Sequence, residues 1–445
     1  MKRRDFLKAS AALTGTLMLP RHVRANTPTP LWLHLHAGGG WDPTLLCDPY
    51  PEVNNIAFSR QLTSTTVAGE QIAYAGLSGN DTSIPKDTGY GFGDFFETYK
   101  DQMLVLNGVN PQTAGHFSGA RFAASGKLDA GYPSIFALAA ALGGADKAMA
   151  YIVGANGSYS VTGGHVAETR LSNSQFLDDA INPNSLFHNT QTMYRDDEYA
   201  LLNAAKAARL QRLMATEPNL ERQKAMTQFS NARSGTPLLQ SVTAALAEGP
   251  QVSRPGQNNN NRLALNLFDD GLRALIGYDM GLTVAATLNA SVFDTHGSHD
   301  SLHPNGLQNL LMAVDWLMQE AQLRSLPMVV VITSEFGRTA SYNVADGKDH
   351  WPNTSWMMLQ TSDLNLFQGG RTIGSSTFDS ATWKIHSNKI DPATLLPTND
   401  DDENGIYLTP DLIHLSLRDM MGITPTDFAT HLYRIDGAPL TGFLL

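Results

Sequence analysis

The 445-residue chain has a single cysteine, Cys47. This excludes an intrachain disulfide. No segment holds eighteen or more consecutive apolar residues, so we expect no stable membrane span. Basic residues are also scarce, 31 against 42 acidic ones, which gives a formal net charge of −11. A chain this acidic is not expected to bind nucleic acid.

The N-terminus differs from the rest because it is basic. Arg3 and Arg4 begin a twin-arginine pattern, a mild apolar run follows, and Ala25 ends a small-residue cleavage pattern. We therefore predict a signal peptide over residues 1–25, export by the twin-arginine translocase, and a periplasmic or secreted protein. The other interpretation is a basic first helix of the mature fold. Residues 1–25 hold six basic residues and one acidic residue, so cleavage takes the net charge from −11 to −16.

Short apolar segments predict the strands of an open sheet. The first, residues 31–36, runs into three glycines and Asp42, as when an α/β sheet presents a ligand at the carboxyl end of a strand. Residues 328–333 are almost continuously apolar, as in a parallel strand buried on both faces. Apolar residues repeat at helical spacing over 307–321, just before that strand, which favours a mostly parallel sheet. Further strands are predicted at 103–109, 151–154 and 282–288.

The mature chain, residues 26–445, is long enough for one large α/β domain with helices on both faces of its sheet. Residues about 195–247 are rich in Ala, Leu, Arg and Gln and have almost no strand signal, so they predict a helical insertion. Residues about 249–261 contain four asparagines and predict a flexible polar loop.

Residues 293–300 hold the densest group of metal-ligand side chains. Asp294 and His296 are two apart, so in an extended segment both point to one side and can reach one ion. His299 and Asp300 are near enough to bind as well or to support the ligands. His303 is predicted to be a surface histidine near a helix. The plainer interpretation is a polar loop with exposed histidines.

Other candidates follow predicted strands. Asp42 is predicted to bind metal, or else to cap the helix that follows it. Glu335 comes just after the 328–333 strand and is also predicted to bind metal, while Arg338 either pairs with it or faces an anionic substrate. Asp349 and His350 lie in a predicted loop and can share the same site.

The loop after the 103–109 strand leads into a predicted helix that begins near His116 and Ser118. Because a helix N-terminus favours anions, either side chain could face a phosphate or sulfate. The plainer interpretations are a helix N-cap for Ser118 and a backbone-bonded loop histidine for His116.

The order of these motifs resembles an uncharacterised family of secreted twin-arginine proteins, which is similar to the alkaline phosphatase and sulfatase superfamily. The most specific motif is Ser-Glu-Phe-Gly-Arg-Thr at 334–339, and the resemblance covers most of residues 30–440. The other motifs are Gly-Gly-Trp-Asp at 39–42, Ala-Ser-Gly at 124–126, Asp-Thr-His at 294–296, Gly-Lys-Asp-His at 347–350 and Thr-Pro-Asp-Leu at 409–412.

The resemblance implies an alkaline phosphatase-like sandwich, with one or two divalent ions at the carboxyl ends of the strands. By position in the sequence, it implies these metal ligands: Asp42, Asp294, His296, Glu335, Asp349 and His350. Two positions depart from the superfamily pattern. His116 stands where the nucleophile is expected, with Ser118 two residues later, and Phe336 stands where a metal-binding histidine is expected.

We therefore predict a secreted, metal-dependent hydrolase of phosphate or sulfate esters. Its ion is Zn, Ca, Mg or Mn, and its substrate is an anionic small molecule or a polysaccharide ester. His116, Ser118 and Arg338 are the predicted catalytic residues. The alternative is a non-catalytic, metal-stabilised protein that binds a surface polysaccharide or a protein partner. A third interpretation, a mutase or isomerase of phosphorylated sugars, also follows from the resemblance.

Overall fold

The computed structural model describes residues 29–54, 62–69, 71–77, 91–155, 158–171, 184–186, 191–234, 236–255, 262–440 and 442–443. The predicted signal peptide and residues 256–261 of the predicted polar loop lie outside them. Among the described helices, none is both long and apolar enough to cross a membrane.

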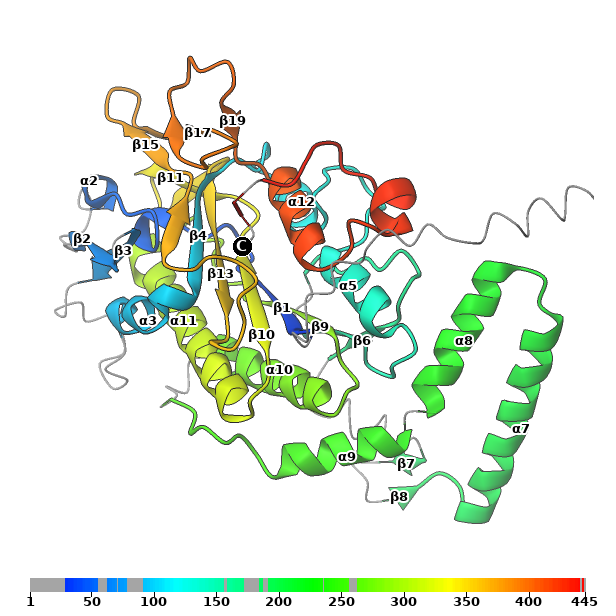
Figure 1. The fold of residues 1–445 in the computed structure, drawn as a ribbon. Coiled ribbons are helices and arrows are strands. Elements are labelled where there is room, and N and C mark those ends of the chain that lie inside the picture. The colour runs from blue at the N-terminus through cyan, green and yellow to red at the C-terminus, as the bar shows by residue number, and fades with distance from the viewer. Residues whose placement is uncertain are drawn as a thin grey trace, which may run out of the picture.

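An eight-stranded sheet forms the centre of the molecule (Figure 1). Every pair of neighbouring strands is parallel except those that β13 makes with β10 and β4. The predicted α/β class with a mostly parallel sheet is therefore confirmed. In spatial order the strands are β14 (Arg371–Ile373), β4 (Met103–Val109), β13 (Thr354–Gln360), β10 (Met328–Thr333), β1 (Leu31–His36), β9 (Ala285–Asn289), β5 (Tyr151–Val153) and β6 (Glu168–Arg170).

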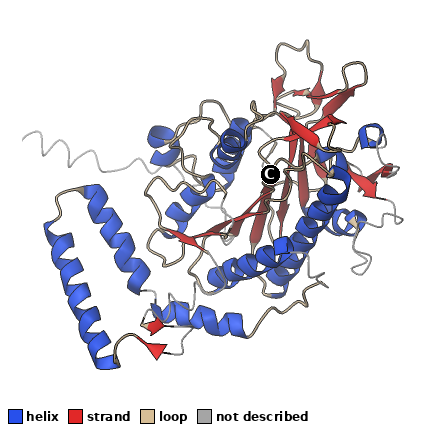
Figure 2. Cartoon of the chain, turned by 180° about the vertical axis from the view of Figure 1, so that it is seen from behind, coloured by secondary structure: helices blue, strands red, loops and turns tan. Residues whose placement is uncertain are grey.

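Helices cover both faces of this sheet, as Figures 1 and 2 show from opposite sides. Alternate residues of β1 enter different cores: Leu33 and Leu35 pack in one, and Trp32 packs in the other. The first core contains apolar residues of α3 (Phe92–Tyr99), α10 (Arg262–Asp279) and α11 (His299–Leu323). The second contains those of α4 (His116–Ser125), α5 (Ile135–Gly144) and α12 (Pro410–Met420).

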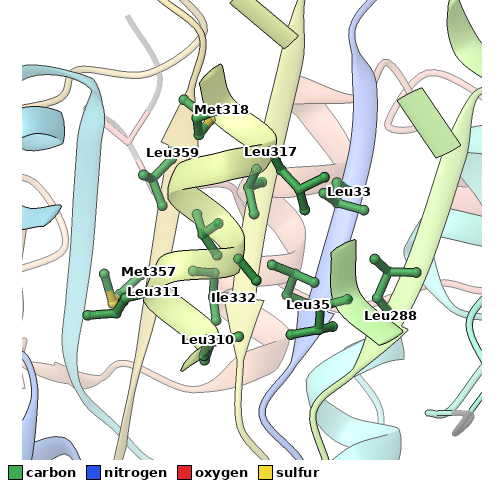
Figure 3. Packing of buried hydrophobic residues seen from close by; sticks show 14 of the residues in the cluster. Leu33, Leu35, Leu288, Leu310, Leu311, Leu317, Met318, Ile332, Met357 and Leu359 are labelled. Carbon is green, nitrogen blue, oxygen red and sulfur yellow. The ribbon is translucent and has the colours of Figure 1, made fainter. Parts of the chain in front are cut away.

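The packing of α11 on the sheet is the centre of the first core (Figure 3). Leu310, Leu311 and Leu317 of the helix lie against the strands and are fully buried. Burial of each such side chain contributes about 1.5–3 kcal/mol, so this face fixes where α11 begins relative to the strand ends. The helix starts at His299, eight residues before the periodic apolar stretch that predicts it.

Three further helices follow one another in the region predicted to be a helical insertion: α7 (Asp196–Thr216), α8 (Leu220–Ser234) and α9 (Thr236–Ala247). In Figures 1 and 2, α7 and α8 lie side by side away from the sheet. None of the α7 residues is buried. The short helical segments elsewhere are η1 (Pro43–Leu45), α2 (Pro51–Asn54), η2 (Lys100–Gln102) and η3 (Phe428–Leu432).

Other strands form small sheets of two or three strands. The one that matters for the site pairs β11 (Gly337–Tyr342) with β12 (Lys348–Trp351), antiparallel. The others pair β2 (Leu62–Ala68) with β3 (Ile72–Leu77), β15 (Ser376–Asp379) with β16 (Lys384–Ser387), β7 (Ser185–Leu186) with β8 (Gln191–Thr192), and β17 (Lys389–Ile390) with β18 (Pro397–Thr398) and β19 (Ile406–Tyr407).

The register of the large sheet brings distant segments to one edge. His36 at the end of β1 is aligned with Thr333 at the end of β10 and with Asn289 at the end of β9. Because β13 is antiparallel, its first residue, Thr354, lies opposite Val109 at the end of β4. The segments that follow β1, β4, β9 and β10, and the one that precedes β13, therefore meet at the same edge.

Candidate metal centre

Three imidazoles from different segments converge on one carboxylate, that of Asp294. The Nε2 atom of His296 lies 3.1 Å from Asp294 Oδ1, that of His350 lies 3.4 Å from the same oxygen, and that of His116 lies 3.5 Å from Oδ2. Asp294 and His296 lie in the segment after β9, His350 lies on β12, and His116 begins α4. The side chain of Asp294 is 51% exposed, so the centre opens to solvent.

Each imidazole is held through its other nitrogen. The Nδ1 atoms of His116, His296 and His350 lie 2.8–2.9 Å from oxygens of Glu335, Asp349 and Ala114 respectively. Two of these oxygens belong to carboxylates and the third to a backbone carbonyl, so all three accept and each Nδ1 donates. In a neutral imidazole with Nδ1 protonated, Nε2 carries a lone pair. When the three rings are in this neutral form, their Nε2 lone pairs face Asp294.

The spacing of these atoms fits a divalent cation. The Nε2 atoms of His296 and His350 are 2.9 Å apart, and two acceptor nitrogens at this distance need a proton or a metal ion beside them. In tetrahedral Zn²⁺ with ligand bonds of about 2.0–2.1 Å, neighbouring ligands lie about 3.3–3.4 Å apart. Ligand atoms of His116, Asp294 and His350 all lie within 4.8 Å of one another. Imidazole nitrogens with one carboxylate suit Zn²⁺ or a similar transition ion better than Ca²⁺.

Arg338 holds the carboxylate at the centre. Its Nη2 donates to Asp294 Oδ1 at 2.9 Å, and its other hydrogen bonds go to the carbonyls of Gly39, Gly40, Phe293 and Lys348. Burial opposes ionisation of Asp294, but the hydrogen bond and charge of Arg338 outweigh it and lower the pKa of that carboxyl. Arg338 is 1% exposed. The expectation that it pairs with Glu335 or faces a substrate is therefore corrected: it pairs with Asp294 and is enclosed by carbonyls.

Glu335 lies behind His116 rather than beside Asp294. Its carboxylate accepts from the Gly39 N–H at 2.7 Å, lies 2.9 Å from His116 Nδ1, and lies 3.1 Å from His36 Nε2. Burial opposes its ionisation, but the charges and hydrogen bonds of His36 and His116 hold the pKa of Glu335 well below its usual range. The hydrogen bond to Glu335 in turn raises the pKa of His116. Glu335 was predicted as a ligand, and the structure places it as the group that orients His116.

Asp349, also predicted as a ligand, has the same relation to His296. Its Oδ1 lies 2.8 Å from His296 Nδ1 and accepts from Asn343 at 3.0 Å. These bonds, chiefly those to His296 and then Asn343, lower the pKa of Asp349. Asp349 and His350 lie on strand β12 rather than in the predicted loop. Even so, both contact His296, because that ring lies between them.

Asp42, also predicted as a ligand, lies outside the metal centre. It is fully buried and caps η1. Its Oδ1 accepts from the N–H and hydroxyl of Thr44, and its Oδ2 accepts from Lys348 Nζ at 2.7 Å and lies 3.1 Å from His299 Nε2. Burial opposes ionisation, but Lys348 and His299 together hold the pKa of Asp42 far below its usual range. Both oxygens are therefore occupied by protein donors, as in the capping interpretation.

Two other expectations change with the structure, and Phe336 contacts the histidines of the centre. Ser118 Oγ lies 2.7 Å from Thr113 Oγ1 and donates to the Gly115 carbonyl, so its described bonds go to the segment just before α4. His303 is fully buried rather than at the surface. Phe336, in the expected position of a metal-binding histidine, packs its ring against those of His116 and His350, with centroids 5.0 and 4.2 Å away.

Sequence reasoning missed His36 and Lys348. His36 lies on β1, where His34 and His36 alternate with leucines inside a buried strand. The available sign of a functional histidine was this pair of polar residues, two apart, in an otherwise apolar strand. Lys348 gave no comparable signal because its partner, Asp42, is 306 residues away.

A glycine brings α4 close enough for His116 to reach Glu335. A Cβ added at Gly119 would lie 2.6 Å from the Glu335 carbonyl oxygen and 2.8 Å from its Cβ. Gly119→Ala is therefore expected to push α4 away from Glu335 and to cost about 1–3 kcal/mol of unfolding free energy. Urea denaturation measures this cost.

The control for this variant is Gly91→Ala. There an added Cβ would meet only the Asp94 carboxylate, at an ordinary 3.5 Å. Gly91 is the N-cap of α3, where alanine is less favourable than glycine, so Gly91→Ala controls for loss of a glycine without a steric clash. If Gly119→Ala were as stable as wild type and kept the same metal affinity, the close approach of α4 would not matter.

Comparison with known proteins places the chain in an uncharacterised family. Residues 31–400 match the family described as "Protein of unknown function (DUF1501)". No curated protein matches the chain. Among solved structures, alkaline phosphatase from the Antarctic bacterium TAB5 is 11% identical over 75% of this chain and 91% of that one, with a TM-score of 0.29. A variant of that enzyme with Mg bound is 10% identical over the same shares, with a TM-score of 0.28. The likeness is weak, and the chemistry of the centre follows from its own side chains.

Proposed function

This chain belongs to the DUF1501 family of proteins of unknown function, and we propose that it is a secreted metal-dependent hydrolase of phosphate or sulfate esters. One observation carries the proposal: three imidazole Nε2 atoms face the carboxylate of Asp294, and each ring is fixed through its Nδ1. Ligands held in this way are ready to bind a cation without rearrangement. The twin-arginine pattern supports export, because that route carries folded proteins.

His116, Asp294 and His350 would hold the ion. A bound ion of this kind supplies a Lewis acid for an ester oxygen and lowers the pKa of water. The exposure of Asp294 supports access for a substrate from solvent. His116 begins α4, and the N–H groups of the first helical turn favour an anion near it.

His296 would act as the general base of the reaction. Its Nε2 carries a lone pair and lies beside the ion site, and Asp349 holds its Nδ1. This Asp–His pair orients the ring and stabilises the imidazolium that forms when Nε2 takes a proton from the attacking water. Of the three predicted catalytic residues, His116 is proposed here as an ion ligand, and Ser118 and Arg338 are given no part in the reaction.

The position of His296 beside Asp294 also favours the alternative, a non-catalytic metal-stabilised protein. If His296 bound the ion as a fourth ligand, the coordination shell would be closed, as in structural zinc sites. The two functions therefore differ in what His296→Gln does. In the hydrolase the variant keeps its ion and loses turnover, whereas in the closed site it loses the ion.

Hydrolysis of 4-nitrophenyl phosphate and 4-nitrophenyl sulfate tests the proposal, with protein treated with chelator and then reloaded with Zn²⁺, Mn²⁺ or Mg²⁺. Chelation is expected to lower kcat/KM by at least about a hundredfold, because a Lewis acid contributes several kcal/mol to the transition state. His116→Ala is expected to do the same. His386→Ala, which changes an exposed histidine on β16, serves as the matched control.

Wild-type protein that binds an ion but hydrolyses neither ester would favour the binding protein over the hydrolase. Wild-type protein that binds none of the three ions would contradict both.

A further inference from the structure

A second polar cluster lies directly behind the metal centre and is fully enclosed. It consists of Asp42, Thr295, His299, His303 and Lys348. Four of these side chains have no exposed surface, and Thr295 is 3% exposed. The cluster joins the segment after β1, the segment after β9, the start of α11 and the start of β12.

The hydrogen bonds of four of these residues form a closed ring. The Asp42 N–H donates to His303 Nε2 at 2.7 Å, and His303 Nδ1 lies 2.9 Å from Thr295 Oγ1. Thr295 Oγ1 lies 2.7 Å from His299 Nδ1, and His299 Nε2 lies 3.1 Å from Asp42 Oδ2.

The ring has one consistent direction. Because a backbone N–H only donates, His303 accepts at Nε2 and donates from Nδ1 to Thr295. Because the Asp42 carboxylate only accepts, His299 donates from Nε2 and accepts at Nδ1 from the Thr295 hydroxyl. Each donor in the ring thus has one acceptor, so a single arrangement satisfies all four residues.

The ring is connected to the metal centre through sequence neighbours. Thr295 lies between Asp294 and His296, and its side chain points into the ring while its neighbours point to the centre. Lys348 donates to Asp42 at 2.7 Å and is followed directly by Asp349 and His350. Its backbone N–H also donates to the Thr295 carbonyl at 3.2 Å. Any shift of Thr295 or Lys348 would therefore move groups that face the ion.

We infer that this ring, with Lys348 bound to it, holds the groups of the metal centre in position, and that the Lys348 ammonium group occupies the place beside Asp42 that a metal ion would otherwise take. On this view Asp42 binds no metal, and the centre holds one ion per chain. The inference rests on the metal centre of the proposed function but requires no ester hydrolysis.

A matched pair of substitutions at Thr295 tests the ring, with Co²⁺ as the probe. Thr295→Val keeps the shape but removes the hydroxyl, whereas Thr295→Ser keeps the hydroxyl. Thr295→Val is expected to lower Co²⁺ affinity by about 10–100-fold and to change the visible absorption of bound Co²⁺, as the loss of a supporting hydrogen bond does at other metal sites. Thr295→Ser is expected to bind Co²⁺ within about threefold of wild type, with the same spectrum.

A second variant separates positioning from stability. In the double variant Asp42→Asn with Lys348→Met, both buried charges are removed together, and such replacements often leave a protein stably folded. We expect this folded variant to bind Co²⁺ about 10–100-fold more weakly than wild type. It also keeps the experiment informative if Thr295→Val does not fold.

Three outcomes would overturn parts of this account, and they are distinguishable. If folded Thr295→Val, or the folded double variant, binds Co²⁺ like wild type with an unchanged spectrum, the ring has no positioning role. If wild-type protein binds two ions per chain and one is lost in Asp42→Asn, Lys348 does not take the place of a metal ion at Asp42. If wild-type protein binds no Co²⁺, the metal centre itself is refuted.

Discussion

Asp294→Asn is expected to lower the affinity for Zn²⁺ by two to three orders of magnitude. Asparagine keeps the shape of the side chain but removes the charge toward which three imidazoles converge. Structural Zn²⁺ in small four-ligand sites binds with about 10–16 kcal/mol, or about 2.5–4 kcal/mol per ligand, which corresponds to a factor of about 70–900. Competition with a chromogenic chelator measures the affinity. Elemental analysis after dialysis measures the ion content.

Asp346→Asn is the control for this prediction. Asp346 is an exposed acidic residue in the turn between β11 and β12, close in the chain to the centre. Its φ of 56° lies in the left-handed region, which asparagine adopts readily, so the fold should be kept. Equal Zn²⁺ affinities for Asp294→Asn and Asp346→Asn would mean that Asp294 is not a ligand.

The second large effect concerns stability. Lys348→Met removes one partner of a fully buried ion pair and leaves the Asp42 carboxylate without its cation. Breaking such a pair costs about 3–5 kcal/mol of unfolding free energy. Adding Asp42→Asn to Lys348→Met should restore most of this loss, because the uncompensated charge is then gone. Urea denaturation of the wild type, the two single variants and the double variant measures the coupling between the residues.

The comparison for this series is Lys206→Met. Lys206 is exposed on α7, and loss of an exposed lysine changes unfolding free energy by only about 0.5 kcal/mol. If Lys348→Met were as stable as Lys206→Met, the ammonium group would contribute nothing in its buried position. A lack of recovery in the double variant would show that the side chains matter for packing rather than for charge.

The two predictions separate two kinds of polar group that look alike in sequence. Asp294 and Asp42 both follow a buried strand of the sheet. Asp294 is half exposed and faces imidazole lone pairs, whereas Asp42 is enclosed and faces an ammonium group. Only the first therefore has the surroundings of a metal ligand.

The order of the elements was accessible from sequence because it depends on local patterns. Strands β1, β4 and β10 have the predicted bounds, since continuous apolar runs bounded by polar residues specify buried strands. The spacing of Asp294 and His296 likewise placed both on one side of an extended segment. Strand β9 was predicted at 282–288 and lies at Ala285–Asn289, because the apolar residues before it belong to the turn after α10.

Which polar side chains share a site was decided by the tertiary structure. The register of β1 on β10 brings His36 to Glu335, so that Glu335 orients His116 instead of binding the ion. Because β13 is antiparallel, it begins at this same edge, and β12, which precedes it in the chain, lies there as well. His350 of β12 therefore joins the centre, and Lys348 reaches Asp42. Local sequence sets the backbone state of a segment, but the partner of a charged group depends on contacts between residues hundreds of positions apart. Sequence therefore determined the strands and the candidate ligands, and only the folded chain divided those candidates into groups that face a cation and groups that hold others in place.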